Sequence, residues 1–255
     1  MSAYQLFLSQ FQFDAGRRLH IGMEREYFLI DAQGSIVPQT TAVLETLNDP
    51  FGWGPELLNG QIECRTHPQH DFNALKHNLL ALDNVGEVAV LGLGLRFWRT
   101  EVAPADIGYN IYPDVRYAKI VANILTQQQT RAACRVAGTH VHVGIGDMDE
   151  AIAVYNALAS ESERLSQLGD HSDGERLKLY RTVQPQCNPP LYENAQAFYE
   201  SATARGFLQN PRGCYDLVRI SVRGTVEVRV FGISPHIDEQ VMWAEEVRKI
   251  AKGAM

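Results

Sequence analysis

The chain has 255 residues, of which 45% are hydrophobic, so it is long and apolar enough to bury a full core as a single domain over residues 1–255. The net charge of −7 and the lack of a long Lys/Arg run argue against nucleic acid or an anionic membrane as the main partner. The start of the chain lacks the features of a signal peptide, and no apolar run is long enough to cross a bilayer. We therefore expect a soluble, cytoplasmic protein, and its four widely spaced cysteines predict reduced thiols.

The first half of the chain predicts three strands, a hairpin partner for the first of them, one short helix and one long helix. In chain order, the expected elements are a short helix over 3–13, a strand over 20–31 that turns at 31–34 into a hairpin partner over 35–38, a strand over 61–65, a helix over 71–91 and a strand over 95–102. Asp71 is a suitable N-cap for the long helix, which should cross the back of the sheet.

The second half alternates helices with the remaining strands. The expected elements are a Pro/Gly/Tyr-rich loop over 104–113, helices over 114–133, 147–168, 191–204 and 238–252, a strand over 139–145, and a strand pair over 214–222 and 225–231 that turns at Arg223-Gly224. The polar stretch 169–174 is expected to be a loop. Loops 104–113 and 169–190 should set substrate specificity.

Four of these strands combine an apolar face with an acidic or imidazole face. Side chains two positions apart point to the same face of a sheet. The same-face pairs are Glu24 with Glu26, His140 with His142, and Glu227 with Arg229, and Glu63 adds a further carboxylate. One face of the sheet can therefore pack a core while the other carries chemistry.

Clustered carboxylates on rigid strands are suited to Mg²⁺ or Mn²⁺, which prefer oxygen ligands in near-octahedral geometry. A histidine among them favours Mn²⁺ or a mixed site that tolerates one imidazole. Arg229, with Arg219 and Arg223 on the neighbouring strand, would grip phosphate oxygens. Metal ligands beside arginines indicate a polyphosphate.

Each motif taken alone also has a structural explanation. His-x-His in a strand can be structural, and Glu-x-Arg is often a cross-strand charge pair. Glu-x-Glu favours function, because two like charges on one strand face repel unless a cation neutralises them. Glu56 fits an ordinary exposed turn at Gly54-Pro55-Glu56, and solvation is the expected state of His67, His70 and His77.

The ordered set of motifs resembles glutamate-cysteine ligase family 2 and the related carboxylate-amine ligases of the glutamine-synthetase-like superfamily. The likeness covers residues 20–245. It lies in Gly22-Met23-Glu24-Arg25-Glu26, in Pro55-Glu56-Leu57-Leu58 leading to Ile62-Glu63, in Gly138-Thr139-His140-Val141-His142-Val143-Gly144, and in Gly224-Thr225-Val226-Glu227-Val228-Arg229-Val230. Arg116-Tyr117 and Arg219 are weaker likenesses.

The resemblance implies an α+β fold whose curved, mainly antiparallel sheet carries the active site on its concave face, with helices on the other face. It also implies an ATP- and Mg²⁺-dependent (or Mn²⁺-dependent) ligase that activates an amino-acid carboxylate as an acyl phosphate for attack by a small amine. The implied metal ligands are Glu24, Glu26, Glu56, Glu63, His140 and Glu227. Arg229 and Arg219 would act on the phosphates as catalytic residues, and Arg116 and His142 would line the nucleotide and substrate pocket.

The chain departs from the family pattern in two places. Relatives usually carry a longer segment than Glu161–Arg181 after the histidine strand, and they continue with a helical region beyond the Glu-x-Arg strand, so a shortened member is expected. A minimal ligase, a ligase completed by a second subunit in a homodimer, and a non-catalytic descendant that binds metal or ligand are the alternatives. A metal-dependent hydrolase would use the same ligands with an activated water and no nucleotide.

Overall fold

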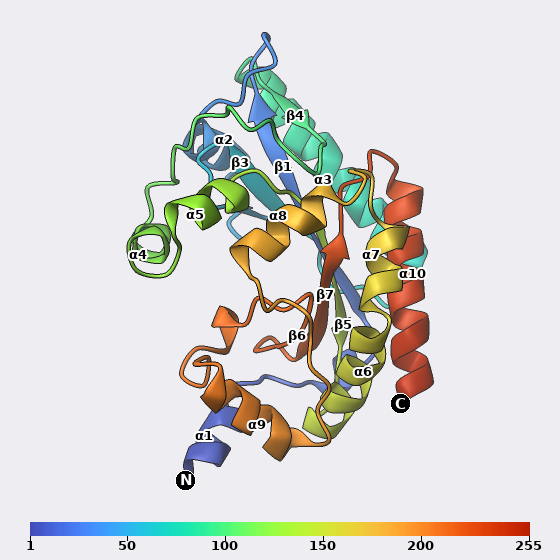
Figure 1. Cartoon of the computed structure of the whole chain (residues 1–255). Coiled ribbons are helices and arrows are strands. Elements are labelled where there is room, and N and C mark those ends of the chain that lie inside the picture. The colour runs from blue at the N-terminus through green and yellow to red at the C-terminus, as the bar shows by residue number, and fades with distance from the viewer.

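The computed structural model describes residues 1–255 and is built on one antiparallel sheet of seven strands (Figure 1). The strands are β1 (Ile21–Ile30), β2 (Trp53–Pro55), β3 (Gln61–Arg65), β4 (Arg96–Trp98), β5 (Thr139–Gly144), β6 (Val218–Ser221) and β7 (Thr225–Phe231). Their order across the sheet is β2-β3-β1-β5-β7-β6, and β4 pairs with the end of β1. The predicted strands that carry acidic or imidazole residues thus lie next to one another.

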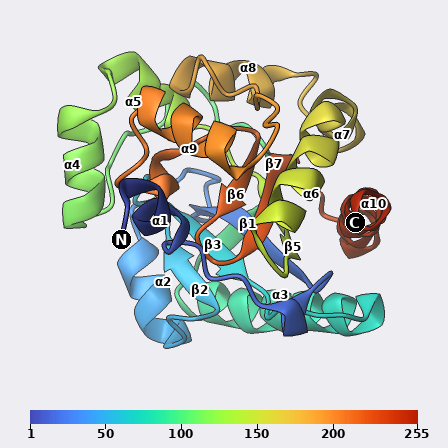
Figure 2. The same cartoon turned by 90° about the horizontal axis from the view of Figure 1, so that it is seen from below.

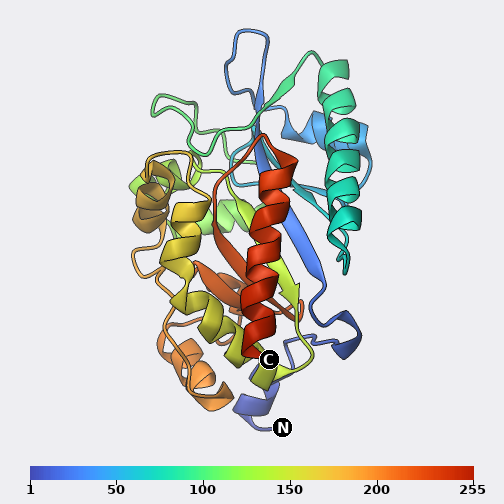
Figure 3. The same cartoon turned by 90° about the vertical axis from the view of Figure 1, so that its right-hand side faces the viewer.

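Helices lie on both sides of this sheet. The helices are α1 (Ala3–Leu8), α2 (Thr40–Leu47), α3 (Phe72–Gly92), α4 (Val115–Asn123), α5 (Gln127–Ala133), α6 (Met148–Ser160), α7 (Ser162–Leu168), α8 (Glu175–Val183), α9 (Ala195–Ala204) and α10 (Ile237–Ala254), with short 3-10 turns at Ala15–Arg17 and Pro211–Gly213. Helices α3, α6, α7 and α10 pack against one face, as Figure 3 shows with α10 running along the strands. Helices α4, α5 and α8 stand beside the opposite face, and Figure 2 places α4 and α10 on opposite sides of the strands.

The alternation of side chains along the strands decides which face is buried. On the helix-covered side of β1, the buried side chains are those of Ile21, Met23, Tyr27 and Leu29. Glu24 and Glu26, which are two positions apart, point to the other side. The valines of β5 and β7 join the same core of buried residues as the inner faces of α6 and α10. Burial of these apolar residues is the main stabilising contribution and fixes the register, since a shift by one residue would turn the acidic face into the core.

The structure confirms the α+β class and most of the predicted strands and long helices. Helix α3 begins after Asp71, whose side chain accepts a hydrogen bond from the Ala74 amide. Strands β1, β3, β5 and β7 and helix α10 lie within two residues of their predicted positions. All four cysteines are free, as expected, and they are also buried. None of the helices combines the length and the apolar character needed to span a membrane.

Several predicted boundaries were wrong. The helix predicted over 114–133 is two helices, because Thr126 caps the start of α5 in a capping box with Gln129. The helix over 147–168 is likewise divided at Glu161. The hairpin partner over 35–38 makes only one bridge to β1, through Ile36.

Other elements were shorter than predicted or were not predicted. The N-terminal helix ends at Leu8, β4 and β6 span three and four residues, and α9 begins only at Ala195. The segment 169–190 is not all loop, since it contains α8. The sequence reasoning also left out α2 and the short strand β2.

Candidate active site

The antiparallel register brings the predicted polar residues together on the face that α3, α6, α7 and α10 leave open. Glu24 on β1 lies opposite His140 on β5, and Glu26 lies opposite Glu63 on β3. On the other side, His142 lies opposite Glu227 on β7, and Glu227 lies opposite Arg219 on β6. These residues lie opposite one another because their strands pair, so backbone hydrogen bonds between strands, rather than loops, fix their positions.

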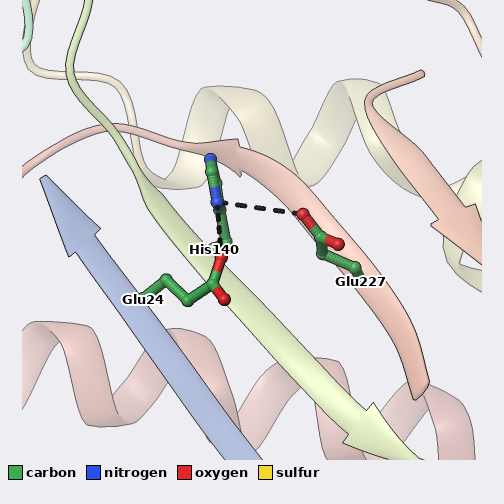
Figure 4. Close-up of side chains that lie close together, drawn as sticks. All are labelled: Glu24, His140 and Glu227. Atoms are coloured by element: carbon green, nitrogen blue, oxygen red, sulfur yellow. Dashed lines mark hydrogen bonds and ion pairs between the residues drawn. The ribbon is translucent and has the colours of Figure 1, made fainter. Parts of the chain in front are cut away.

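His140 is the centre of two overlapping groups of ligand atoms. In Figure 4 its imidazole points toward Glu24 and Glu227, with Nδ1 lying 3.3 Å from Glu24 Oε2 and 3.8 Å from Glu227 Oε1. Its Nε2 lies 3.7 Å from Glu26 Oε1. Glu24, His140 and Glu227 form one group of atoms within 4.8 Å of each other, and Glu26, Glu63 and His140 form the second.

The protonation states of the first group suit metal ligands. Burial, with the charge of Arg229, lowers the pKa of His140 to about 4, so the imidazole is neutral at pH 7 and has a lone pair to offer. Burial opposes ionisation of Glu24 as well, but His142 and His140 outweigh it and hold the pKa of this carboxyl well below its usual range. A neutral imidazole beside a carboxylate is a suitable ligand set for Mn²⁺ or Mg²⁺.

The second group is a concentration of negative charge that a cation would relieve. Burial raises the pKa of Glu26 to about 7 and that of Glu56 to about 8, where Glu26 and Glu24 add repulsion. Burial and repulsion from Glu24 and Glu56 also raise the pKa of Glu63 well above its usual range. Carboxylates that resist ionisation together fit a site for a divalent cation, whose charge favours the ionised forms.

Glu227 is held between two arginines. It is completely buried, and Arg219 Nε donates to Glu227 Oε2 at 2.7 Å while Arg229 Nη1 donates to Glu227 Oε1. Burial alone would raise the pKa of Glu227, but Arg219 and Arg229 together lower it far below its usual range. The two arginines predicted to contact phosphates therefore lie at the acidic cluster, where they neutralise one of its members.

The remaining predicted residues also face this cluster. Glu56 is half-buried directly after β2, so the alternative of an ordinary exposed turn is wrong. His142 Nδ1 lies 3.0 Å from Thr225 Oγ1, and its Nε2 lies 3.5 Å from Glu24 Oε2. Arg116 approaches from α4, where the neighbouring Tyr117 hydroxyl donates to the Pro55 carbonyl at 2.7 Å.

Every predicted site residue lines a single cleft of about 510 Å³. The volume lies within the range of sites that hold small ligands. His67, His70 and His77 lie outside the cleft and are exposed, as expected. The cleft thus combines carboxylates, one neutral imidazole and several arginines, a combination that can bind divalent cations together with an anionic ligand.

Arg176 and Tyr180 of α8 are site residues that sequence reasoning did not identify. The buried Arg176 guanidinium donates to the carbonyls of Ala137, Val230 and Arg229 at 2.9–3.1 Å. The Tyr180 hydroxyl accepts a hydrogen bond from Arg229 Nε at 3.2 Å. Their spacing of four residues, which places both on one helix face, was the available signal.

Known sequences similar to this chain belong to the family that its motifs resemble. The profile of Glutamate-cysteine ligase family 2 (GCS2) matches residues 20–161. The chain is 27% identical over 252 residues to "Putative glutamate--cysteine ligase 2" of Salinispora arenicola, covering 91% of this chain. It is 30% identical over 263 residues to "Putative glutamate--cysteine ligase 2-2" of Saccharopolyspora erythraea, and this match covers 92% of this chain. In both cases the chain spans 65% of the length of the relative.

Solved structures show the same fold. The bifunctional glutathione synthetase from Pasteurella multocida matches 98% of this chain and 41% of its own with a TM-score of 0.63 at 15% identity. The glutamate–cysteine ligase of Francisella tularensis, solved in complex with AMP, matches 95% of this chain and 68% of its own with a TM-score of 0.63 at 13% identity. At these identities the likeness establishes the glutamine-synthetase-like fold that the sequence predicted.

Proposed function

Because the chain belongs to glutamate-cysteine ligase family 2, we propose that it is an ATP- and Mg²⁺-dependent ligase that joins an amino-acid carboxylate to a small amine. The observation that carries the proposal is the position of His140, a neutral imidazole shared by two groups of carboxylates, beside a glutamate bonded to two arginines. The AMP bound to the Francisella tularensis enzyme of the same fold supports a nucleotide as ligand.

The chain's own residues provide what phosphoryl transfer requires, which is positioning and charge stabilisation rather than a protein nucleophile. Glu24, His140 and Glu227 would hold one divalent ion, and Glu26 and Glu63, with Glu56 nearby, would hold a second. When bound, such ions neutralise phosphate oxygens and align the triphosphate. Mn²⁺ would fit the same ligands.

Arg219 and Arg229 would stabilise the charge that develops during transfer. An oxygen of the substrate carboxylate forms a bond to the γ-phosphorus as the bond from that phosphorus to ADP breaks. The amine nitrogen then attacks the acyl carbon, phosphate leaves with the carbon–oxygen electron pair, and the nitrogen loses a proton. Both guanidinium groups already donate to Glu227, and their N–H groups that do not bond Glu227 could donate to phosphate oxygens.

Arg116 and His142 line the cleft near the ends of this cluster and would contact nucleotide or substrate. Residues from Glu24 to Arg229 share one cleft, so residues 1–255 would form a single catalytic domain. The protein would act in the cytoplasm as a homodimer, and light scattering of the purified protein would measure its oligomeric state.

Calorimetric titration with ATP, in Mg²⁺ and then in a chelator, tests the proposal. A ligase should bind ATP only with the metal, and it should release ADP and phosphate when a suitable carboxylate and amine are both supplied. Absence of ATP binding, or hydrolysis of an amide without ATP, would contradict the proposal and favour the binding protein or the hydrolase.

A further inference from the structure

A second cavity, of about 440 Å³, is lined by α6, α7, the start of α8 and the end of β7. Figure 1 shows α7 and α8 on either side of the end of β7. Val230 lines this cavity and its neighbour Arg229 lines the cleft, because successive strand residues point to opposite faces. Arg176 is the only residue that lines both, and its bonds to three backbone carbonyls hold it between them. The two cavities are therefore separate.

Glu101 lines the second cavity with a carboxylate that is only half satisfied. The residue is 4% exposed, and its Oε1 accepts a hydrogen bond from the His171 amide at 2.9 Å, whereas no protein group bonds its Oε2. The nearby Asp170 differs, because its two oxygens accept from the amides of Ser172 and Gly174. A buried carboxylate oxygen without a donor is unfavourable, so Glu101 is suited to a ligand that brings one.

The backbone leaves room for this carboxylate at Gly232. A Cβ at Gly232 would overlap the Oε1 atom of Glu101, so no larger residue fits beside it. The Gly232 amide donates to the Gly169 carbonyl at 2.8 Å, which holds the strand end in place. The carboxylate therefore has a fixed position in the wall of the cavity.

Ser166 on α7 adds a second polar group without a partner. It is 7% exposed, it lines the same cavity, and its Oγ bonds no protein group. Other helical hydroxyls donate to the carbonyl four residues earlier, as Ser160 does to Asn156 and Thr182 does to Lys178. The Ser166 hydroxyl makes no such bond and is available to a ligand.

A primary ammonium group fits this carboxylate and this hydroxyl better than a metal ion or an anion does. It has three donors, enough for both groups. A divalent cation needs several oxygen ligands, and both groups of ligand atoms that could hold one lie in the cleft. An anion would meet the charges of Glu101, Asp170 and Glu163. The volume of the cavity suits a small organic molecule.

Two arginines also line the second cavity, and they differ in what they offer. Arg176 already donates from Nε, Nη1 and Nη2 to backbone carbonyls. Arg181 is exposed, so its guanidinium could pair with a carboxylate on the same ligand. An amine and an amino acid both carry the required ammonium, and only the amino acid would also use Arg181.

We propose that the second cavity is a ligand site outside the active-site cleft, which binds a small molecule through a primary ammonium group held by Glu101 and Ser166. This inference does not depend on ligase activity, because neither residue belongs to the metal cluster or lines the cleft.

Titration of ¹⁵N-labelled protein with propylamine, alanine and propionate tests the site by NMR. Propylamine and alanine carry an ammonium group, and propionate is similar in size without one. The amides of His171 and Gly232 report on the second cavity, and those of Glu24 and Glu227 report on the cleft. Propylamine and alanine should shift the His171 and Gly232 signals to saturation, and propionate should not.

The same titration distinguishes the two sources of the ammonium. Tighter binding of alanine than of propylamine would identify an amino acid as the ligand, and the reverse order would identify a simple amine. Shifts of the cleft signals alone, a response to propionate alone, or no response to any of the three compounds would overturn the proposal.

Two variants test the assigned side chains. Glu101→Gln keeps a carbonyl for the His171 amide but loses the charge, so propylamine should bind at least roughly tenfold more weakly. Ser166→Ala removes a hydroxyl that bonds nothing in the protein, so this variant should fold like the wild type and bind propylamine roughly threefold more weakly. It decides the outcome if Glu101→Gln does not fold.

Glu245→Gln is the control, since it makes the same change of charge at an exposed position of α10 outside both cavities. Its affinity for propylamine should equal that of the wild type. Wild-type affinity in Ser166→Ala and in folded Glu101→Gln would overturn the site.

Discussion

Glu26 on β1 and Glu63 on β3 are direct partners across the antiparallel ladder, so two carboxylates face each other on the floor of the cleft. Like charges in this position destabilise a sheet. Arg65 Nε lies 3.4 Å from Glu63 and compensates only one of the two charges. A pair of this kind is costly for the metal-free protein and becomes favourable when a divalent cation binds between the two strands.

Replacing Glu63 with Gln should therefore have opposite effects on stability and on metal binding. In a chelator at pH 7, the variant should be more stable than the wild type by up to about 1 kcal/mol, because burial and repulsion from Glu24 and Glu56 oppose the ionised form of Glu63 that the unfolded chain adopts, whereas an amide does not ionise. Its affinity for Mn²⁺ should fall at least roughly tenfold, because a ligand charge is lost. Urea unfolding and Mn²⁺ titration by electron paramagnetic resonance measure the two effects. Unchanged Mn²⁺ affinity would remove Glu63 from the metal site.

Glu56 should make the stability of the metal-free protein depend on pH. Its pKa is raised from 4.5 to about 8, chiefly by burial, so the folded protein retains a proton that the unfolded chain releases near pH 4.5. The contribution of this retained proton to the free energy of unfolding is fully present below about pH 4.5 and is lost as the pH rises through about 8. Between about pH 5 and pH 9, the wild type should therefore lose stability relative to Glu56→Gln in urea unfolding with a chelator present.

Glu45, exposed on α2, provides the control for this measurement. The difference in stability between the wild type and Glu45→Gln should stay constant over the same pH range. If the wild type and Glu56→Gln also keep a constant difference, Glu56 is ionised in the folded protein, and burial does not control its charge.

Glu227→Gln should reduce both stability and metal binding. The carboxylate is completely buried and bonded to two arginines, so the amide leaves Arg219 and Arg229 without a charged partner, which should cost about 3–5 kcal/mol of unfolding free energy. Mg²⁺-dependent ATP binding should be lost. Circular dichroism at low temperature would show whether the variant is folded before the ATP titration is interpreted.

Val228→Ala is the matched control, since this neighbour on β7 points into the core. It should lose about 1–3 kcal/mol of stability yet keep its affinity for Mg²⁺ and ATP. If Glu227→Gln binds Mg²⁺-ATP as tightly as the wild type, Glu227 is not a metal ligand.

The strands and their chemical faces could be predicted from the sequence because strand alternation is a local property. Glu24 and His140 share a face with Glu26 and His142 whatever the rest of the chain does. The register was not predictable in the same way. That Glu24 lies opposite His140, and Glu227 opposite His142, depends on which strands pair and where, and this is set by packing of the whole core.

Short elements were missed because their stability comes from tertiary contacts rather than from a sequence pattern. Helix α8 has nine residues and follows a glycine in the left-handed conformation, so its local signal was weak. Its position depends on Arg176, which reaches three backbone carbonyls in other parts of the chain. Glu56 was similarly undervalued, because only the pairing of β2 with β3 places it in the cleft.

Gly138→Ala should disturb the site through Arg176. A Cβ at Gly138 would lie 2.2 Å from Arg176 Nη2, and Arg176 cannot move without breaking bonds to three carbonyls. The Gly138 amide donates to Glu26 Oε2 at 2.8 Å, so the displaced backbone would also misplace a predicted metal ligand. We expect a loss of about 1–3 kcal/mol in urea unfolding together with weaker Mn²⁺ binding.

Gly92→Ala is the matched control, because a Cβ at this position at the end of α3 would meet no atom within 4 Å. This variant should gain about 0.5–1 kcal/mol of unfolding free energy and leave Mn²⁺ binding unchanged. Equal Mn²⁺ affinity of both variants would show that the contact between Gly138 and Glu26 does not position the metal ligand.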